Sequence, residues 1–86
     1  MNPERFEIFS AVYRKQLARA IKEHPEDYPW AHEDVWPNTV DEVADRMLRA
    51  VERGSYNKDG YAFKYTCKAL GIKYTYTAIS SFLKGD

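Results

Sequence analysis

Residues 63–83 read FKYTCKALGIKYTYTAISSFL, and this stretch decides the interpretation of the whole chain. A short helical pattern breaks at Gly71 and a second helical pattern follows it. Glycine is typical of a helix end, because it adopts the left-handed backbone conformation without steric cost. Thr75 stands where its side chain can cap the next helix. The sequence therefore predicts helices over 60–70 and 75–84, joined by a tight turn.

The second predicted helix has two chemically different sides. At 100° per residue, Ile79, Phe82 and Leu83 fall on one side, together with Thr75 and Tyr76. The opposite side has no carboxylate and carries only hydroxyl and amine groups: Tyr74, Thr77, Ser80, Ser81 and Lys84, with Lys73 entering from the turn.

Hydroxyl and amine groups of this kind are suited to a phosphate backbone. Short hydroxyl side chains donate to phosphate oxygens, and lysines release counterions when they bind phosphates. Four residues on the outer side of the preceding helix are expected to contact the phosphate backbone of the nucleic acid on either side of the last helix: Tyr61, Lys64, Tyr65 and Lys68. The apolar side of that helix is Phe63, Cys67 and Leu70. The sequence thus predicts a nucleic-acid-binding surface.

Leu70, Gly71 and Ile72, with the small residue Cys67 before them, resemble the helix-turn-helix motif of small phage and bacterial DNA-binding proteins. The ending AISSFLKG, residues 78–85, is similar to a recognition helix followed by its stop. Where the family has apolar residues, six and nine positions after the glycine, this chain has Thr77 and Ser80.

The resemblance implies a small non-enzymatic DNA-binding protein of phage or mobile-element type, with its last helix facing DNA. Arginine, asparagine and glutamine make the bidentate contacts that distinguish one base from another. The presumed reading helix contains none of them. The resemblance therefore implies binding with limited sequence discrimination.

Two further helices are predicted ahead of this pair. Over 2–23, Asn2 can cap and Pro3 fits the first helical position. Over 39–53, Thr39 and Glu42 form a capping box, and Gly54 follows as a terminator. The first helix has an apolar stripe, which Ile8 and Ile21 widen, made of Phe6, Phe9, Val12, Tyr13, Leu17 and Ala20. We expect this stripe to lie inside an all-α bundle of about four helices; the alternative is a homodimer interface.

The connector 24–38, HPEDYPWAHEDVWPN, combines prolines, acidic residues and three large aromatic residues. We expect its aromatic side chains to pack over the core. The alternative is an acidic, aromatic docking surface, which would make the chain an inhibitor or adaptor that binds a host or phage protein.

Composition sets the frame for these interpretations. With 86 residues, 44% of them hydrophobic and 30% charged, the chain suits one globular domain over 1–86. The net charge is zero, yet residues 1–54 hold 8 Lys and Arg against 11 Asp and Glu, whereas 55–86 hold 5 Lys against 2 Asp. This asymmetry predicts one face for a polyanion.

Cys67 is the single cysteine and cannot form an internal disulfide, which is typical of a reducing compartment. The chain shows no signal-peptide pattern and no membrane-spanning apolar run, so we expect a cytoplasmic protein without a membrane partner.

Catalytic and metal sites are not expected. His24 and His32 lie near acidic residues but lack the ligand spacing of zinc sites. Cys67 lies on an apolar helical face, which predicts a buried core thiol and not a nucleophile. Without a positioned acid–base pair or a glycine-rich phosphate loop, the sequence predicts no enzyme and no cofactor.

Overall fold

The computed structural model describes residues 1–29, 38–56 and 60–85, except the side chains of residues 38 and 39. Within these ranges the chain forms four α-helices, one short 3-10 helix and no strand. The elements are α1 (Pro3–Glu23), η1 (Pro25–Asp27), α2 (Asn38–Glu52), α3 (Tyr61–Leu70) and α4 (Tyr76–Lys84). The expected small all-α bundle is confirmed. Among the described residues, no helix is both long and apolar enough to cross a membrane.

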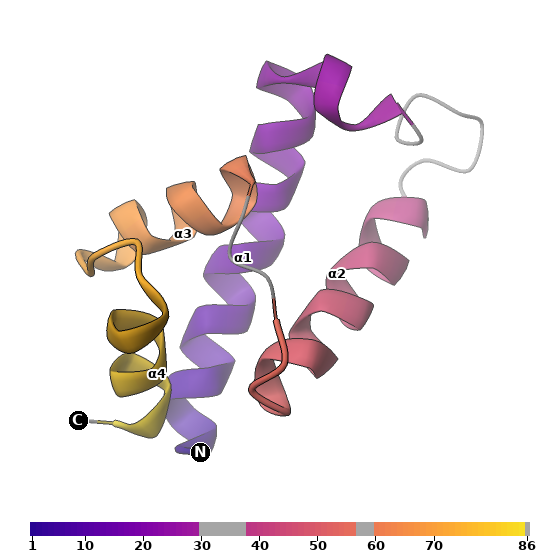
Figure 1. Cartoon of the computed structure of the whole chain (residues 1–86). Helices are drawn as coiled ribbons and strands as arrows, with labels where there is room; N and C mark the ends of the chain where they lie inside the picture. The colour runs from indigo at the N-terminus through magenta and orange to yellow at the C-terminus, as the bar shows by residue number, and fades with distance from the viewer. Residues whose placement is uncertain (30–37, 57–59, 86) are drawn as a thin grey trace.

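Helix α1 is the element on which the others pack. Its main contacts are with α3, and it also contacts α2 and α4. Figure 1 shows α2 on one side of α1, and α3 and α4 on the other. The apolar stripe of α1 is buried at Phe9, Tyr13, Leu17, Ala20 and Ile21. Ile8, which we expected to widen this stripe, is 44% exposed.

The core is rich in aromatic rings that meet around Phe63 of α3. The centroid of the Phe63 ring lies 5.1 Å from that of Tyr13, 6.3 Å from Phe9 and 5.8 Å from Tyr56. All four side chains are buried. Large rings remove much apolar area from water, so this cluster supplies much of the packing energy between α1 and α3.

Two smaller side chains complete the α3 side of the core. The Cys67 side chain is buried, which confirms the expected core thiol. Thr66 is fully buried, and its hydroxyl donates to the Ala62 carbonyl at 2.6 Å, so its polar atom keeps a partner inside the helix.

The ends of the helices follow local signals. The Asn2 side chain accepts from the Arg5 amide at 3.1 Å, as expected for the α1 cap. The expected capping box of α2 depends on the Thr39 side chain, which lies outside the described residues. At the C-terminus of α4, the Leu83 carbonyl accepts from the Asn2 amide at 2.9 Å. This bond joins the two ends of the described chain.

The turn between α3 and α4 is closed by hydrogen bonds at both ends. Gly71 has a φ of 70°, and the Ile72 amide donates back to the Cys67 carbonyl at 3.0 Å. This pattern is a Schellman motif, which needs a left-handed residue at the glycine position. Thr75 then caps α4 by accepting from the Ala78 amide at 3.1 Å. The predicted turn and cap are confirmed.

Replacing Gly71 by alanine tests how much the turn depends on this left-handed residue. A Cβ at Gly71 would meet no atom within 4 Å, so the cost is backbone strain alone. We expect Gly71→Ala to lower the free energy of unfolding by about 1–2 kcal/mol, measured by urea denaturation. Gly71→Asn should cost less, because asparagine tolerates the left-handed region better. Equal stability of wild type and Gly71→Ala would contradict this account.

Candidate nucleic-acid interface

Four lysines are distributed over the surface of the α3–turn–α4 unit. Lys64 and Lys68 lie on α3, Lys73 lies in the turn and Lys84 ends α4, and all four are exposed. Within the described part of the chain, none of them forms an ion pair or a side-chain hydrogen bond. The segment 60–85 also contains no Asp or Glu. These four ammonium groups are therefore not neutralised by neighbours along their own segment.

The predicted division of α4 into two sides is observed only in part. Ile79 and Leu83 are buried, Phe82 is half-buried, and Thr77 is exposed. Ser80 and Ser81 lie at the boundary, where both are half-buried. The part of the predicted surface that reaches solvent most freely is thus Thr77 and the lysines. We call Lys64, Lys68, Lys73, Thr77 and Lys84 the basic face.

The prediction that Tyr76 lies on the apolar side of the last helix needs correction. We expected it beside Ile79, but it is 45% exposed at the start of α4. Its hydroxyl donates to the Tyr56 carbonyl at 2.8 Å, and its ring lies 5.3 Å from the Tyr56 ring. A tyrosine has an apolar ring and a polar tip, so it suits the rim of a core where the tip finds a partner.

Tyr74 was predicted to bind nucleic acid, but in the structure its hydroxyl forms a hydrogen bond within the protein. This hydroxyl donates to the Gly60 carbonyl at 3.2 Å, and the half-buried ring packs against the core. The bond ties the α3–α4 turn to the residue that precedes α3.

The prediction that Tyr61 and Tyr65 point away from the core is wrong. Both rings are half-buried and pack against the C-terminal end of α1. Tyr61 stacks on His24, with 3.5 Å between ring centroids. Tyr65 donates its hydroxyl proton to the Glu23 carboxylate at 2.8 Å, and the His24 Nε2 atom lies 2.8 Å from the same hydroxyl.

Arg19 completes this seam between α1 and α3. Its guanidinium lies 4.2 Å from the centre of the Tyr65 ring and also binds the Glu23 carboxylate at 3.0 Å. The hydrogen bond from Tyr65, followed by that from Arg19, lowers the pKa of Glu23 below its ordinary value. The same Glu23 bond raises the pKa of Tyr65. Tyr61 and Tyr65 therefore fix α3 on α1, and of the four predicted residues of α3 only Lys64 and Lys68 are exposed.

Arg5 was not predicted as a site residue, and the structure brings it to the edge of α4. The Arg5 guanidinium lies 4.8 Å from the centre of the Phe82 ring, a cation–π arrangement. The predicted reading helix has no arginine of its own, and α1 supplies one beside it. No local pattern could have found this contact, since its two residues lie at opposite ends of the chain.

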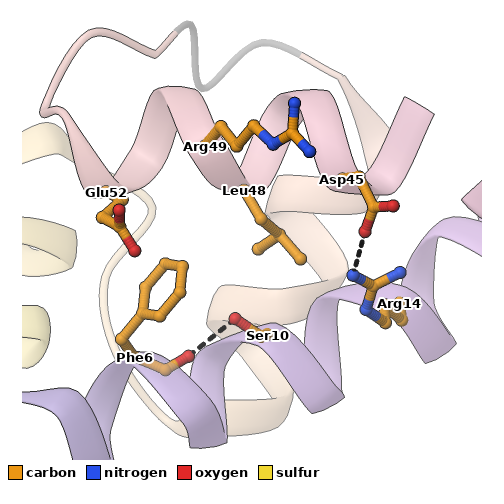
Figure 2. Close-up of a pocket in the computed structure, with 7 residues that line it drawn as sticks. All are labelled: Phe6, Ser10, Arg14, Asp45, Leu48, Arg49 and Glu52. Atoms are coloured by element: carbon orange, nitrogen blue, oxygen red, sulfur yellow. Dashed lines mark hydrogen bonds and ion pairs between the residues drawn. The ribbon is translucent and has the colours of Figure 1, made fainter. Parts of the chain in front are cut away.

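A second candidate is the groove between α1 and α2, of about 270 Å³, shown in Figure 2. Its floor includes Phe6 and Leu48, and its rim includes Arg14, Asp45 and Glu52. Arg14 forms an ion pair with Asp45, which lowers the pKa of that carboxyl, and lies 3.9 Å from Asp41. Two arginines, Arg14 and Arg49, and two carboxylates, Asp45 and Glu52, line this groove, so it has no excess of positive charge for a polyanion.

The acidic residues after α1 form a third cluster. Candidate ligand atoms of His24, Glu26 and Asp27 lie within 4.8 Å of one another, closer together than the sequence suggested. The two carboxylates are exposed, and the contacts of His24 with Tyr61 and Tyr65 explain its position. His32, Glu33 and Asp34, considered in the sequence analysis as part of the same cluster, lie outside the described residues.

Comparison of the chain with protein-family models, with curated proteins and with solved structures found no match. The resemblance to the helix-turn-helix motif therefore stays a prediction.

Removing the Tyr65 hydroxyl tests the seam between α1 and α3. In Tyr65→Phe we expect the pKa of Glu23 to rise toward its usual value, because its first hydrogen-bond donor is lost. A lowered pKa means that this contact stabilises the fold above the usual glutamate pKa and is lost as the pH falls. An NMR titration of the Glu23 carboxyl measures the shift.

Tyr61→Phe is the matched control, because Tyr61 contacts His24 through its ring and not Glu23 through its hydroxyl. It should leave the Glu23 titration unchanged. Identical Glu23 curves in wild type and Tyr65→Phe would show that the Tyr65–Glu23 bond does not form in solution.

Proposed function

We propose that this chain is a small nucleic-acid-binding protein, with DNA as its ligand, and that the basic face of α3 and α4 makes the contact. The observation that carries this proposal is the set of four exposed lysines without ion pairs in the described part of the chain. Lysines near phosphates release condensed counterions, which supplies most of the affinity in non-specific binding.

The arrangement of charge supports the proposal despite the net charge of zero. Helix α2 lies on the other side of α1 from α3 and α4, as Figure 1 shows, and α2 carries acidic residues. Those acids include Asp41 and Asp45, which lie near Arg14. A phosphate backbone approaching α4 would therefore meet lysines and hydroxyl groups, whereas at α3 it would also meet the Glu23 carboxylate beside Tyr65, which is paired with Arg19.

The turn supports a defined binding surface. Gly71 and Thr75 fix the end of α3 and the start of α4, so Lys73 lies on a segment whose backbone is held by hydrogen bonds. A preordered surface loses less conformational entropy when it binds. The helix pair with its central glycine is also what the resemblance to the helix-turn-helix motif implies for a DNA-binding protein of phage or mobile-element type.

The described residues of this surface favour contact with the backbone over reading of bases. Segment 60–85 contains no Arg, Asn or Gln, the residues that make bidentate contacts to guanine and adenine. We therefore propose limited sequence discrimination and no catalytic step. Cys67, the single cysteine of the chain, is buried and fits a cytoplasmic location, where thiols stay reduced.

The alternative function is protein binding through the acidic, aromatic connector 24–38. The structure places Tyr28 partly in the core, where it packs against buried residues. This contact removes one of the three large aromatic residues from the proposed docking surface. Trp30 and Trp36 lie outside the described residues. A host or phage protein would be the partner in that case. A homodimer that forms through the exposed Ile8 region is a separate alternative, and light scattering would detect it.

A salt titration tests the proposal. Four lysine–phosphate contacts would give a slope of log K against log salt of about −3.6 for duplex DNA, or about −2.8 for a single strand. In Lys73→Gln we expect weaker binding and a slope smaller in magnitude by about 0.7–0.9, because one phosphate contact is lost. Fluorescence anisotropy with a labelled oligonucleotide at several salt concentrations measures both quantities.

Lys15→Gln is the matched control, because Lys15 is exposed on α1, outside segment 60–85, and the substitution removes the same charge. It should change neither affinity nor slope beyond the small effect of net charge. If wild type binds neither duplex nor single strand at low salt, or if Lys15→Gln and Lys73→Gln behave alike, the basic face is not a nucleic-acid site. Protein binding through the connector would then be the function to pursue.

A further inference from the structure

We propose that the nucleic acid bound by the basic face is single-stranded and that Tyr76 stacks on one of its bases. This proposal rests on the proposed function, and it departs from the duplex groove that the helix-turn-helix resemblance implies. It assigns a role to Tyr76, which was predicted to lie on the apolar side of α4 and is exposed instead.

Tyr76 is an exposed aromatic residue whose position is fixed. It keeps 45% of its surface accessible, although it has a large aromatic side chain. Its hydroxyl donates to the Tyr56 carbonyl at 2.8 Å, so both the ring position and the polar tip are set. The fold therefore holds the Tyr76 ring in a fixed position in which part of it is exposed to solvent.

The support under Tyr76 extends to the centre of the core. The Tyr56 ring lies 5.3 Å from the Tyr76 ring and stacks on Phe63 at 5.8 Å, with 12° between the Tyr56 and Phe63 planes. Phe63 is the buried ring around which the α1–α3 packing forms. A base that stacks on Tyr76 would meet a ring already held in place, so binding would cost little side-chain entropy.

The surroundings of Tyr76 suit a nucleotide. Lys73 precedes it by three residues, so their Cα atoms are at most about 11 Å apart, and a lysine can reach the phosphate of a base stacked on the ring. Thr77, which follows Tyr76, is exposed and can donate a hydrogen bond. The first turn of α4 contains no acidic residue that would repel a phosphate.

These features favour a single strand over a duplex. In a duplex both faces of each base are covered by its neighbours, so a protruding tyrosine has no base face to contact. In a single strand the bases are open, and stacking on an aromatic ring is tolerant of sequence. The absence of Arg, Asn and Gln from 60–85 agrees with this mode, because stacking does not need them.

The experiment compares a labelled oligothymidylate with a duplex of the same length, by fluorescence anisotropy in one low-salt buffer. We expect wild type to bind the single strand more tightly than the duplex. In Tyr76→Leu we expect single-strand affinity to fall at least five-fold, since one stacked base is worth about 1–3 kcal/mol, and duplex affinity to stay within about two-fold. The salt slope should not change, because the lysines remain.

Tyr76→Phe separates stacking from positioning. It keeps the ring and removes only the bond to the Tyr56 carbonyl, so it should bind the single strand nearly as well as wild type. Circular dichroism at the assay temperature confirms that each variant is folded, and Lys73→Gln in the same assay reports on the basic face independently. A variant that unfolds is replaced by Tyr76→Met, which keeps the apolar volume without the ring.

Three outcomes would overturn the single-strand proposal: tighter binding to duplex, wild-type single-strand affinity in Tyr76→Leu, or equal losses in Tyr76→Phe and Tyr76→Leu. The last result would show that the hydroxyl positions the helix and that the ring does not stack. If these outcomes occur while Lys73→Gln still reduces the salt slope, the proposed function survives and only the role of Tyr76 falls. If no nucleic acid binds at all, both proposals fall together.

Discussion

The packing of α3 on α1 through Phe63 is the interaction on which the rest of the structure depends. Phe63 contacts Phe9 and Tyr13 of α1 and also Tyr56, which precedes α3. Once this ring is buried, the helical period sets the direction of every other side chain of α3, and Thr66 and Cys67 point inward with it. Lys64 and Lys68 lie on the other side of α3 from Phe63, Thr66 and Cys67, and both are exposed. The basic face is thus a geometric consequence of an apolar contact.

Helix α4 is held at both of its ends, and this determines where its polar side chains lie. At its start Thr75 caps the first turn, and at its end the Leu83 carbonyl accepts from the Asn2 amide. Arg5 stacks over Phe82 beside that bond, so the first turn of α1 and the last turn of α4 stabilise each other. A helix of 9 residues has little stability alone, since nucleation is costly and few backbone bonds follow it. Its order in this chain comes from these end contacts and from Ile79 and Leu83 in the core.

Sequence reasoning succeeded where the decisive partner lies within a few residues. The Asn2 cap, the Gly71 turn and the Thr75 cap are each satisfied by a backbone group close by, so composition and spacing were enough to find them. It failed for tyrosines. A helical wheel treats a tyrosine either as apolar, because of its ring, or as polar, because of its hydroxyl. In the structure the direction of each tyrosine side chain depends on a distant hydrogen-bond partner, which is Glu23 for Tyr65 and the Tyr56 carbonyl for Tyr76. The Arg5–Phe82 contact could not be found for the same reason.

A protein with zero net charge can attract a polyanion when its charges are separated by more than the screening length. At physiological ionic strength this length is about 8 Å, and a helix with its side chains is about 10–12 Å across. Helix α1 lies between α2 and the pair α3 and α4 (Figure 1), so the carboxylates of α2 would act only weakly on a polyanion at α3 and α4. The Arg14–Asp45 pair reduces their effect further, because it neutralises one of them at close range. The relevant quantity is therefore the local charge of segment 60–85, which carries four lysines and no acid, and not the sum over the chain.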